Sequence, residues 1–219
     1  MTTDKPLSAR DQILHRIRVA NGGTSNAATA QSGWSSLARG YKRSATQTRQ
    51  GVLILLEDRL RDYDAQVIRS TPADVLRCVA ERLAARGKHR IVVPAGFPAE
   101  WLPPSVTFVL DESLTPAELD QVDGVITGST VAIAETGTVV LQNVPGQGRR
   151  AATLVPDYHL CLVSADDVVE TVPEAIARMQ ATATLSTTFV SGPSATADIE
   201  MTRIKGVHGP RFLDVILIV

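Results

Sequence analysis

TPADVLRCVAERLAARG, residues 71–87, and the run RIVV that follows at 90–93 are the segments from which the architecture of this chain can be inferred. A threonine followed by proline is typical of a helix start, because the hydroxyl caps a free backbone N–H and proline needs no such partner. Apolar residues then recur at three-and-four spacing until Gly87, where a glycine ends the helix. RIVV has the apolar character of a strand covered on both faces. The segment therefore predicts a helix that leads into a buried strand.

The same alternation continues on both sides of this segment. Strands are predicted at 65–68, 106–110, 124–127, 158–163, 188–190 and 213–219, and helices at 52–60, at 115–118 behind a capping box, and at 166–180 with a break at Pro173. Two short apolar runs, 131–134 and 138–141, flank a turn and predict a hairpin. Strands that alternate with helices predict an α/β fold with a mainly parallel sheet flanked by helices.

The first fifty residues differ in composition from the rest. A short helix is predicted at 7–19, after which residues 20–50 are rich in Asn, Gly, Thr, Ser, Ala and Gln and contain no acidic side chain. Such a composition predicts a flexible, poorly structured basic arm. We therefore expect an arm at 1–50 and an α/β domain at 51–219. Two interpretations of the arm are open: it is solvated, or it docks on a partner chain.

Composition excludes several classes of function. A formal charge of −1 over 219 residues argues against a general nucleic-acid binder, which needs a basic surface. The sequence has no apolar run long enough to span a membrane, and its first residues lack the apolar core of a secretory signal. Cys78 and Cys161 are far apart and belong to no CxxC or Cys/His cluster, so we expect no metal or iron–sulfur site in this chain. A reducing cytoplasm is the expected location.

A glycine-rich segment at 146–151, GQGRRA, matches the permissive dinucleotide-binding pattern. The short segment before the strand at 158 contains Pro156 and leaves no room for the crossover helix that this pattern requires. Dinucleotide binding is therefore not predicted. Two interpretations are left: the segment is a mobile loop, or Arg149 and Arg150 face an anionic ligand, because arginine binds carboxylate or phosphate through two parallel hydrogen bonds.

The hairpin turn contains Glu135, Thr136 and Gly137. Glu135 is either a solvated turn carboxylate or, if apolar neighbours raise its pKa, a nucleophile or general base beside residues small enough to admit a ligand. A second polar turn begins with Thr127 and Gly128 at the end of a predicted strand, which is consistent with a ligand crevice at the carboxyl edge of an α/β sheet.

Small and polar residues also gather near the end of the chain, in SGPSATADIE at 191–200 and GVHGP at 206–210. Small residues let a ligand approach the backbone closely. His208 lies in a Gly/Pro loop, which places it well for ligand contact, and a structural role and a functional role are both open. His159 alternates with apolar residues and is interpreted as a core residue. We expect Glu135 and His208 to be catalytic and the ligand to contact Thr127, Gly128, Thr136, Gly137, Arg149, Arg150, Ser191, Gly192, Ser194, Thr196 and Asp198.

Taken together, DGVITG at 123–128, AIAETGT at 132–138, PDYH at 156–159 and the two segments near the C-terminus resemble the LUD domain family in its short form. The resemblance covers residues 52–219. It implies a fold like that of the sugar-phosphate isomerase and coenzyme A transferase group (the NagB/RpiA/CoA-transferase-like fold). It also implies a bacterial role in oxidising L-lactate to pyruvate, with the iron–sulfur clusters carried by partner proteins and no cofactor in this chain.

Three functions are compatible with this resemblance. The first is a non-redox component of a lactate-oxidising system that binds an organic acid or supports assembly. The second is an independent enzyme of the related fold that uses Glu135 for acyl transfer or for sugar-phosphate isomerisation. The third is a regulatory protein that binds a metabolite without reacting. Whether the chain is itself an enzyme stays open at this point.

Overall fold

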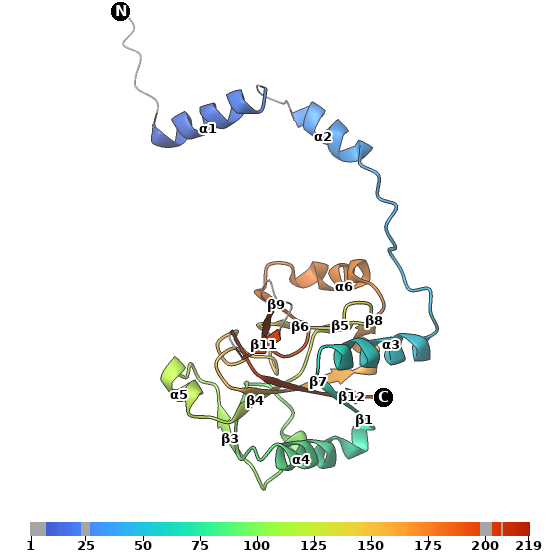
Figure 1. The fold of residues 1–219 in the computed structure, drawn as a ribbon, viewed down its shortest axis with the longest axis vertical. Coiled ribbons are helices and arrows are strands. Elements are labelled where there is room, and N and C mark those ends of the chain that lie inside the picture. Colours follow the sequence, from blue (N-terminus) through green and yellow to red (C-terminus); the bar gives the residue numbers. More distant parts are fainter. Residues whose placement is uncertain (1–7, 23–26, 198–202, 207) are drawn as a thin grey trace, which may run out of the picture. The chain divides into compact units, whose positions relative to one another are not determined.

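The computed structural model describes residues 8–22, 27–197, 203–206 and 208–219 (Figure 1). The chain forms two compact units, Met1–Tyr41 and Lys42–Val219. The first unit contains α1 (Ala9–Ala20), which confirms the helix predicted near the N-terminus, and α2 (Ala27–Ser36), which was not predicted. Ser8 caps α1 by accepting a hydrogen bond from the Asp11 N–H at 3.2 Å. Neither helix has a buried residue among those described, and in α1 only Leu14 is half-buried.

A six-stranded sheet forms the centre of the second unit, and all of its neighbouring strands are parallel. This arrangement confirms the predicted α/β class. The strands follow one another across the sheet in the order β1 (Gln66–Ser70), β12 (Phe212–Ile218), β7 (Tyr158–Ser164), β4 (Gly124–Thr127), β2 (Arg90–Val93) and β3 (Thr107–Leu110).

Helices cover both faces of this sheet. On one face α4 (Val75–Ala85) buries Val75, Val79 and Leu83 completely, as the three-and-four spacing predicts, against Ile91 and neighbouring strand residues. The other face is covered by α3 (Arg49–Asp62), which packs on residues of β7 and β12, and by α5 (Pro116–Asp120), which begins at the predicted capping box and packs near Val92 and Val125. Burial of apolar side chains on both faces explains why the central strands have so few polar residues.

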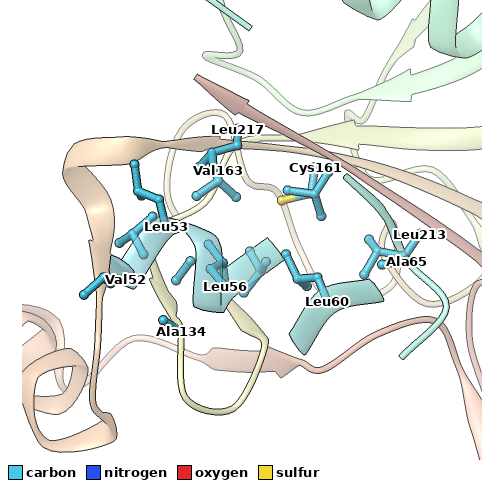
Figure 2. Close-up of a cluster of buried hydrophobic side chains, with 14 of the residues drawn as sticks. Val52, Leu53, Leu56, Leu60, Ala65, Ala134, Cys161, Val163, Leu213 and Leu217 are labelled. Atoms are coloured by element: carbon cyan, nitrogen blue, oxygen red, sulfur yellow. The ribbon is translucent and has the colours of Figure 1, made fainter. Parts of the chain in front are cut away.

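A second, four-stranded sheet packs on the other side of α3. Its strands are ordered β8 (Val168–Val169), β5 (Val131–Ile133), β6 (Thr138–Gln142) and β9 (Thr187–Val190), and β5 and β6 form the predicted antiparallel hairpin. Figure 2 shows side chains of α3, among them Leu56 and Leu60, between Ala134 after β5 and residues of β7 and β12 such as Cys161. Helix α6 (Val172–Arg178) covers the outer face of the second sheet, and β10 (Ala195–Ala197) pairs with β11 (Arg203–Lys205).

The helix predicted at 166–180, with a break at Pro173, is wrong in its first part. Residues Ala165–Asp167 form a 3₁₀ turn, and Val168–Val169 pair with β5 as β8. Helix α6 begins only after Thr171, which forms a capping box with Glu174 and places Pro173 in the first turn. A proline in the first turn loses no helical hydrogen bond, so Pro173 marks the start of a helix rather than a break.

The helices described in the structure include none that is long and apolar enough to cross a membrane. Cys78 and Cys161 are both buried and unpaired, which confirms their interpretation as small core residues.

Candidate functional site

A cavity of about 240 Å³ opens on the α3 side of the central sheet, near the amino ends of β7 and β12. Strand β9 and the turns that precede β10 and β12 form its walls. The residues that line it are Arg150, Thr153, His159, Phe189, Val190, Ser191, Gly192, Pro193, Ser194, Ala195, His208, Gly209, Pro210 and Leu213. Of the residues that the sequence predicted to contact a ligand, the cavity brings together Arg150, Ser191, Gly192, Ser194 and His208.

His159 lies at the base of the cavity and is only 2% exposed. Strands β4 and β7 pair so that Thr127 stands opposite Cys161 and Val125 opposite His159, which places all four side chains on one face of the sheet. The Thr127 hydroxyl and His159 Nε2 are therefore close enough to form a hydrogen bond of 2.8 Å. Burial, and then the positive charge of Arg150, lower the pKa of His159 to about 4. The imidazole is neutral at physiological pH.

Arg149 and Arg150 are adjacent in sequence but differ in their partners. Arg149 binds both oxygens of Asp111 and also donates to the Leu114 carbonyl, so its charge is already paired. Within the described part of the chain, Arg150 donates only to Thr153, at 3.3 Å to the carbonyl and 3.3 Å to the hydroxyl. Among the described residues no carboxylate lies within 4.0 Å of Arg150 to form an ion pair. Arg150 is thus the arginine that is available to an anion in the cavity.

Backbone hydrogen bonds connect the two polar segments near the C-terminus. The Ser194 N–H donates to the Pro210 carbonyl at 2.8 Å, and the His208 N–H donates to the Ser194 hydroxyl at 3.1 Å. These bonds bring His208 to the cavity wall, while its side chain stays exposed to solvent. Gly192 is required for packing within the protein: its φ is +81°, and a Cβ atom here would lie 2.4 Å from Tyr63 Cβ.

The hairpin turn that contains Glu135 does not line the cavity. Lys42 Nζ lies 2.7 Å from Glu135 Oε1, so the carboxylate that was predicted to react is held in an ion pair. Gly137 packs against the backbone of Arg59 in α3, where a Cβ atom would lie 2.9 Å from its carbonyl carbon. The turn touches the cavity only indirectly, because Thr138 hydrogen-bonds both Thr136 and the cavity residue Ser191, each at 2.7 Å between hydroxyl oxygens.

The structure also reveals a buried carboxylate, Glu170, that sequence reasoning missed. It accepts backbone N–H groups of Thr46 at 2.7 Å and Gln47 at 2.9 Å, and it forms an ion pair with Lys42. These partners favour the charged form and lower the pKa of Glu170 to about 2. The last part of the predicted arm is therefore attached to the domain, because residues 42–47 supply hydrogen-bond donors to this carboxylate.

The other predicted site residues have structural surroundings. Thr127 is buried beneath the cavity, and the Gly128 N–H donates to the Gly146 carbonyl at 2.8 Å. Thr196 lies in β10, but its side chain, like all of Asp198, is outside the described part of the chain. A polar residue that interrupts an apolar strand was the available signal for His159, which was interpreted as core; it is indeed buried, but it also lines the cavity. In the described ranges no group of three His, Cys, Asp or Glu side chains could hold a metal ion.

Comparison with known proteins agrees with the geometry of the domain. The LUD domain profile matches residues 24–218, which is most of the chain. The chain belongs to the LUD domain family. A LUD relative named lactate utilization protein C, from Deinococcus radiodurans, is 42% identical over 181 residues, which is 81% of this chain and 84% of that protein. The protein of the same name from Geobacillus thermodenitrificans is 28% identical over 187 residues, or 76% of this chain and 78% of the relative.

A solved structure supports the same family assignment. The crystal structure of a DUF162 family protein from Deinococcus radiodurans superposes with a TM-score of 0.70 at 39% sequence identity. The superposition covers 79% of this chain and 99% of that protein. The LUD domain seen here is therefore an α/β architecture shared with a solved relative.

Proposed function

We propose that this chain serves lactate utilization as a non-redox component that binds a small organic acid. The names of the curated relatives support the process, and the cavity supports the binding role. A volume of about 240 Å³ suits a molecule of a few carbon atoms rather than a large cofactor. A few polar side chains that converge on a concave surface are typical of a ligand site.

The observation that carries the proposal is the state of Arg150. Its guanidinium lines the cavity without a carboxylate partner among the described residues, whereas neighbouring Arg149 is bound to Asp111. A guanidinium matches the two oxygens of a carboxylate, and each charge-assisted bond is stronger than a neutral one. A short carboxylic acid at Arg150 would extend toward His159 at the base of the cavity.

Electron transfer in this proposal belongs to iron–sulfur partner proteins, as the family resemblance implies. Cys161 points into the core beside Thr127, and burial raises the pKa of its thiol to about 12, so it stays a thiol. The chain would then deliver or hold the acid for its partners, in the cytoplasm. Co-purification with iron–sulfur proteins from lactate-grown cells tests this assembly, and recovery of the chain without them contradicts it.

Direct binding measurements test the role of the cavity. We expect L-lactate or pyruvate to bind saturably by isothermal titration calorimetry and to raise Tm, because a ligand at about 100 times its Kd adds about 2.7 kcal/mol of stability. Arg150→Met should weaken binding at least about tenfold, since it removes a charge-assisted contact. Arg77→Met, on the exposed face of α4, is the matched control and should bind as the native protein does. No binding of either acid, or equal binding by Arg150→Met, contradicts the proposal.

The alternative of a stand-alone enzyme requires Glu135 to be free. The ion pair with Lys42 and the absence of Glu135 from the cavity wall favour a structural role for this carboxylate. Glu135→Gln should therefore leave acid binding unchanged. An acyl adduct trapped at Glu135 with an acyl-coenzyme A would support the alternative, including the expected relation to the coenzyme A transferase group.

A further inference from the structure

One ring nitrogen of His159 is open to the cavity. The His159 side chain is almost completely buried, and its hydrogen bond to Thr127 uses Nε2. Among the described residues, every side-chain nitrogen or oxygen that is fully buried has a hydrogen-bond partner. Since no described residue bonds Nδ1 and His159 lines the cavity, Nδ1 is the atom that faces the open space. A ligand in the cavity would meet this nitrogen.

A chain of hydrogen bonds runs from the imidazole into the core, and its direction decides which ring nitrogen carries the proton. Cys161 is a thiol, and its Sγ lies 3.6 Å from the Gly128 carbonyl oxygen and 4.0 Å from that of Leu162, either of which can accept its one proton. The Thr127 hydroxyl donates to Cys161 Sγ at 3.6 Å. The Thr127 hydroxyl has one proton, and when it goes to Cys161, Thr127 Oγ1 accepts from His159 and the proton of the neutral ring is on Nε2. Nδ1 then presents a lone pair to the cavity.

We propose that the cavity selects 2-hydroxy acids over the corresponding 2-oxo acids, with His159 Nδ1 accepting the hydrogen bond of the 2-hydroxyl group while Arg150 holds the carboxylate. This inference rests on the proposed function and names the ligand class of the same site. The pairing is one of complementary chemistry. A guanidinium can only donate, which suits a carboxylate, and an unprotonated imidazole nitrogen can accept, which suits a hydroxyl.

The discrimination follows from what a 2-oxo acid lacks. Its carbonyl oxygen would face the Nδ1 lone pair with no proton between them, and both acceptors would be removed from water. A site that is built to bind a hydroxyl group rejects an analogue without it much more strongly than an apolar pocket rejects a change in size. His159 is in this scheme a specificity-determining residue, and Thr127 and Cys161 are positioning residues that keep the proton on Nε2.

Calorimetric titration of the full chain with L-lactate, pyruvate and propionate tests the inference. Propionate is the matched ligand because it has the carboxylate but neither oxygen at the second carbon. We expect L-lactate to bind at least about tenfold more tightly than pyruvate. In His159→Leu this ratio should fall to about one while all three acids still bind through Arg150.

The outcomes separate the two proposals. Equal affinity for L-lactate and pyruvate in the native protein overturns the selectivity and leaves the binding role intact. No binding of any of the acids overturns the proposed function and this inference with it. If His159→Leu fails to fold, ¹⁵N NMR of the native protein still decides the matter. A protonated Nε2, with an Nδ1 resonance that shifts on adding L-lactate, supports the inference, and a protonated Nδ1 overturns it.

Discussion

Tyr158 and His159 are neighbours in β7, but they belong to two different polar sites, one on each face of the same sheet. On the α4 face, Asp214 accepts hydrogen bonds from the Tyr158 hydroxyl at 3.0 Å, from Arg82 at 2.9 Å and from Arg86 at 2.6 Å. On the α3 face, His159 has one bonded nitrogen and one that faces a cavity. The first site is charged and complete, and the second is neutral and incomplete.

The difference shows how the partners of a buried polar group indicate its role. Asp214 is fully buried, and both of its oxygens are used by side chains of this chain, so it has nothing left to offer a ligand. Burial of an ion is costly unless such partners are present. His159 avoids that cost by staying neutral, which leaves a lone pair that only a ligand or water can use. The three predictions below test this contrast.

The largest effect is expected at the complete site. Asp214→Asn removes the charge that two arginines and Tyr158 surround, and it should lower the free energy of unfolding by about 3 kcal/mol, measured by urea denaturation. Asp58→Asn is the control, since Asp58 is an exposed partner of Arg59 and should cost at most about 0.5 kcal/mol. Equal losses in the two variants would show that Asp214 is not the buried anchor described here. Native L-lactate affinity is expected in both variants, because neither residue lines the cavity.

A smaller effect is expected from protonation of His159. Its pKa is near 6.5 in the unfolded chain and about 4 in the folded protein, so between these values the unfolded state binds more protons. Stability from this residue is therefore present above pH 6.5 and is lost as the pH falls toward 4, by about 2 kcal/mol at pH 5. Denaturation of the native protein and of His159→Gln at pH 7 and pH 5 isolates this contribution.

The control for the pH experiment is His15→Gln on the exposed helix α1, which should retain the native pH dependence. The low pKa of Glu170 acts in a separate range, because its stabilisation is lost only as the pH falls from 4.5 toward 2. A native pH dependence in His159→Gln between pH 7 and pH 5 would mean that His159 is not the group that titrates.

Much of the fold could be predicted because local sequence and tertiary environment agree. Helix α4 has its apolar spacing and its ending within one segment, and the β5–β6 hairpin is bounded by a turn that contains Gly137. The predicted start is wrong in detail, because Thr71 makes no side-chain cap and Pro72–Asp74 form a 3₁₀ turn before α4 begins at Val75. The prediction failed at β8, where Val168–Val169 are extended only because β5 is there to pair with them. Such pairing between distant segments leaves little trace in a short run of residues.

The site was less predictable, because its chemistry depends on which partners the fold supplies. Arg149 and Arg150 are indistinguishable in the sequence, and only the position of Asp111 shows which of them is already paired. Glu135 was predicted to react, but Lys42, from the predicted arm, holds it. An isolated polar residue in an apolar strand was the one usable signal. It marks His159 at the cavity and also Asp214 in the complete site, so the signal finds both sites without telling them apart.

The smallest change in stability is expected at Thr127, and it sharpens the contrast most. Thr127→Val keeps the shape of the side chain but leaves His159 Nε2 without its partner, which should cost about 1 kcal/mol. Thr130→Val is the control: it removes another side-chain hydroxyl, half-buried in this case, which donates to Gln147 at 2.9 Å. If the hydrogen-bond chain decides which nitrogen of His159 carries the proton, the two variants lose similar stability, but only Thr127→Val lowers the ratio of L-lactate to pyruvate affinity.

Thr127→Ser, which restores the hydroxyl, should restore that ratio. Equal ratios in all three variants would mean that the proton of His159 is placed by something other than Thr127, and the incomplete site would owe its selectivity to the cavity wall instead.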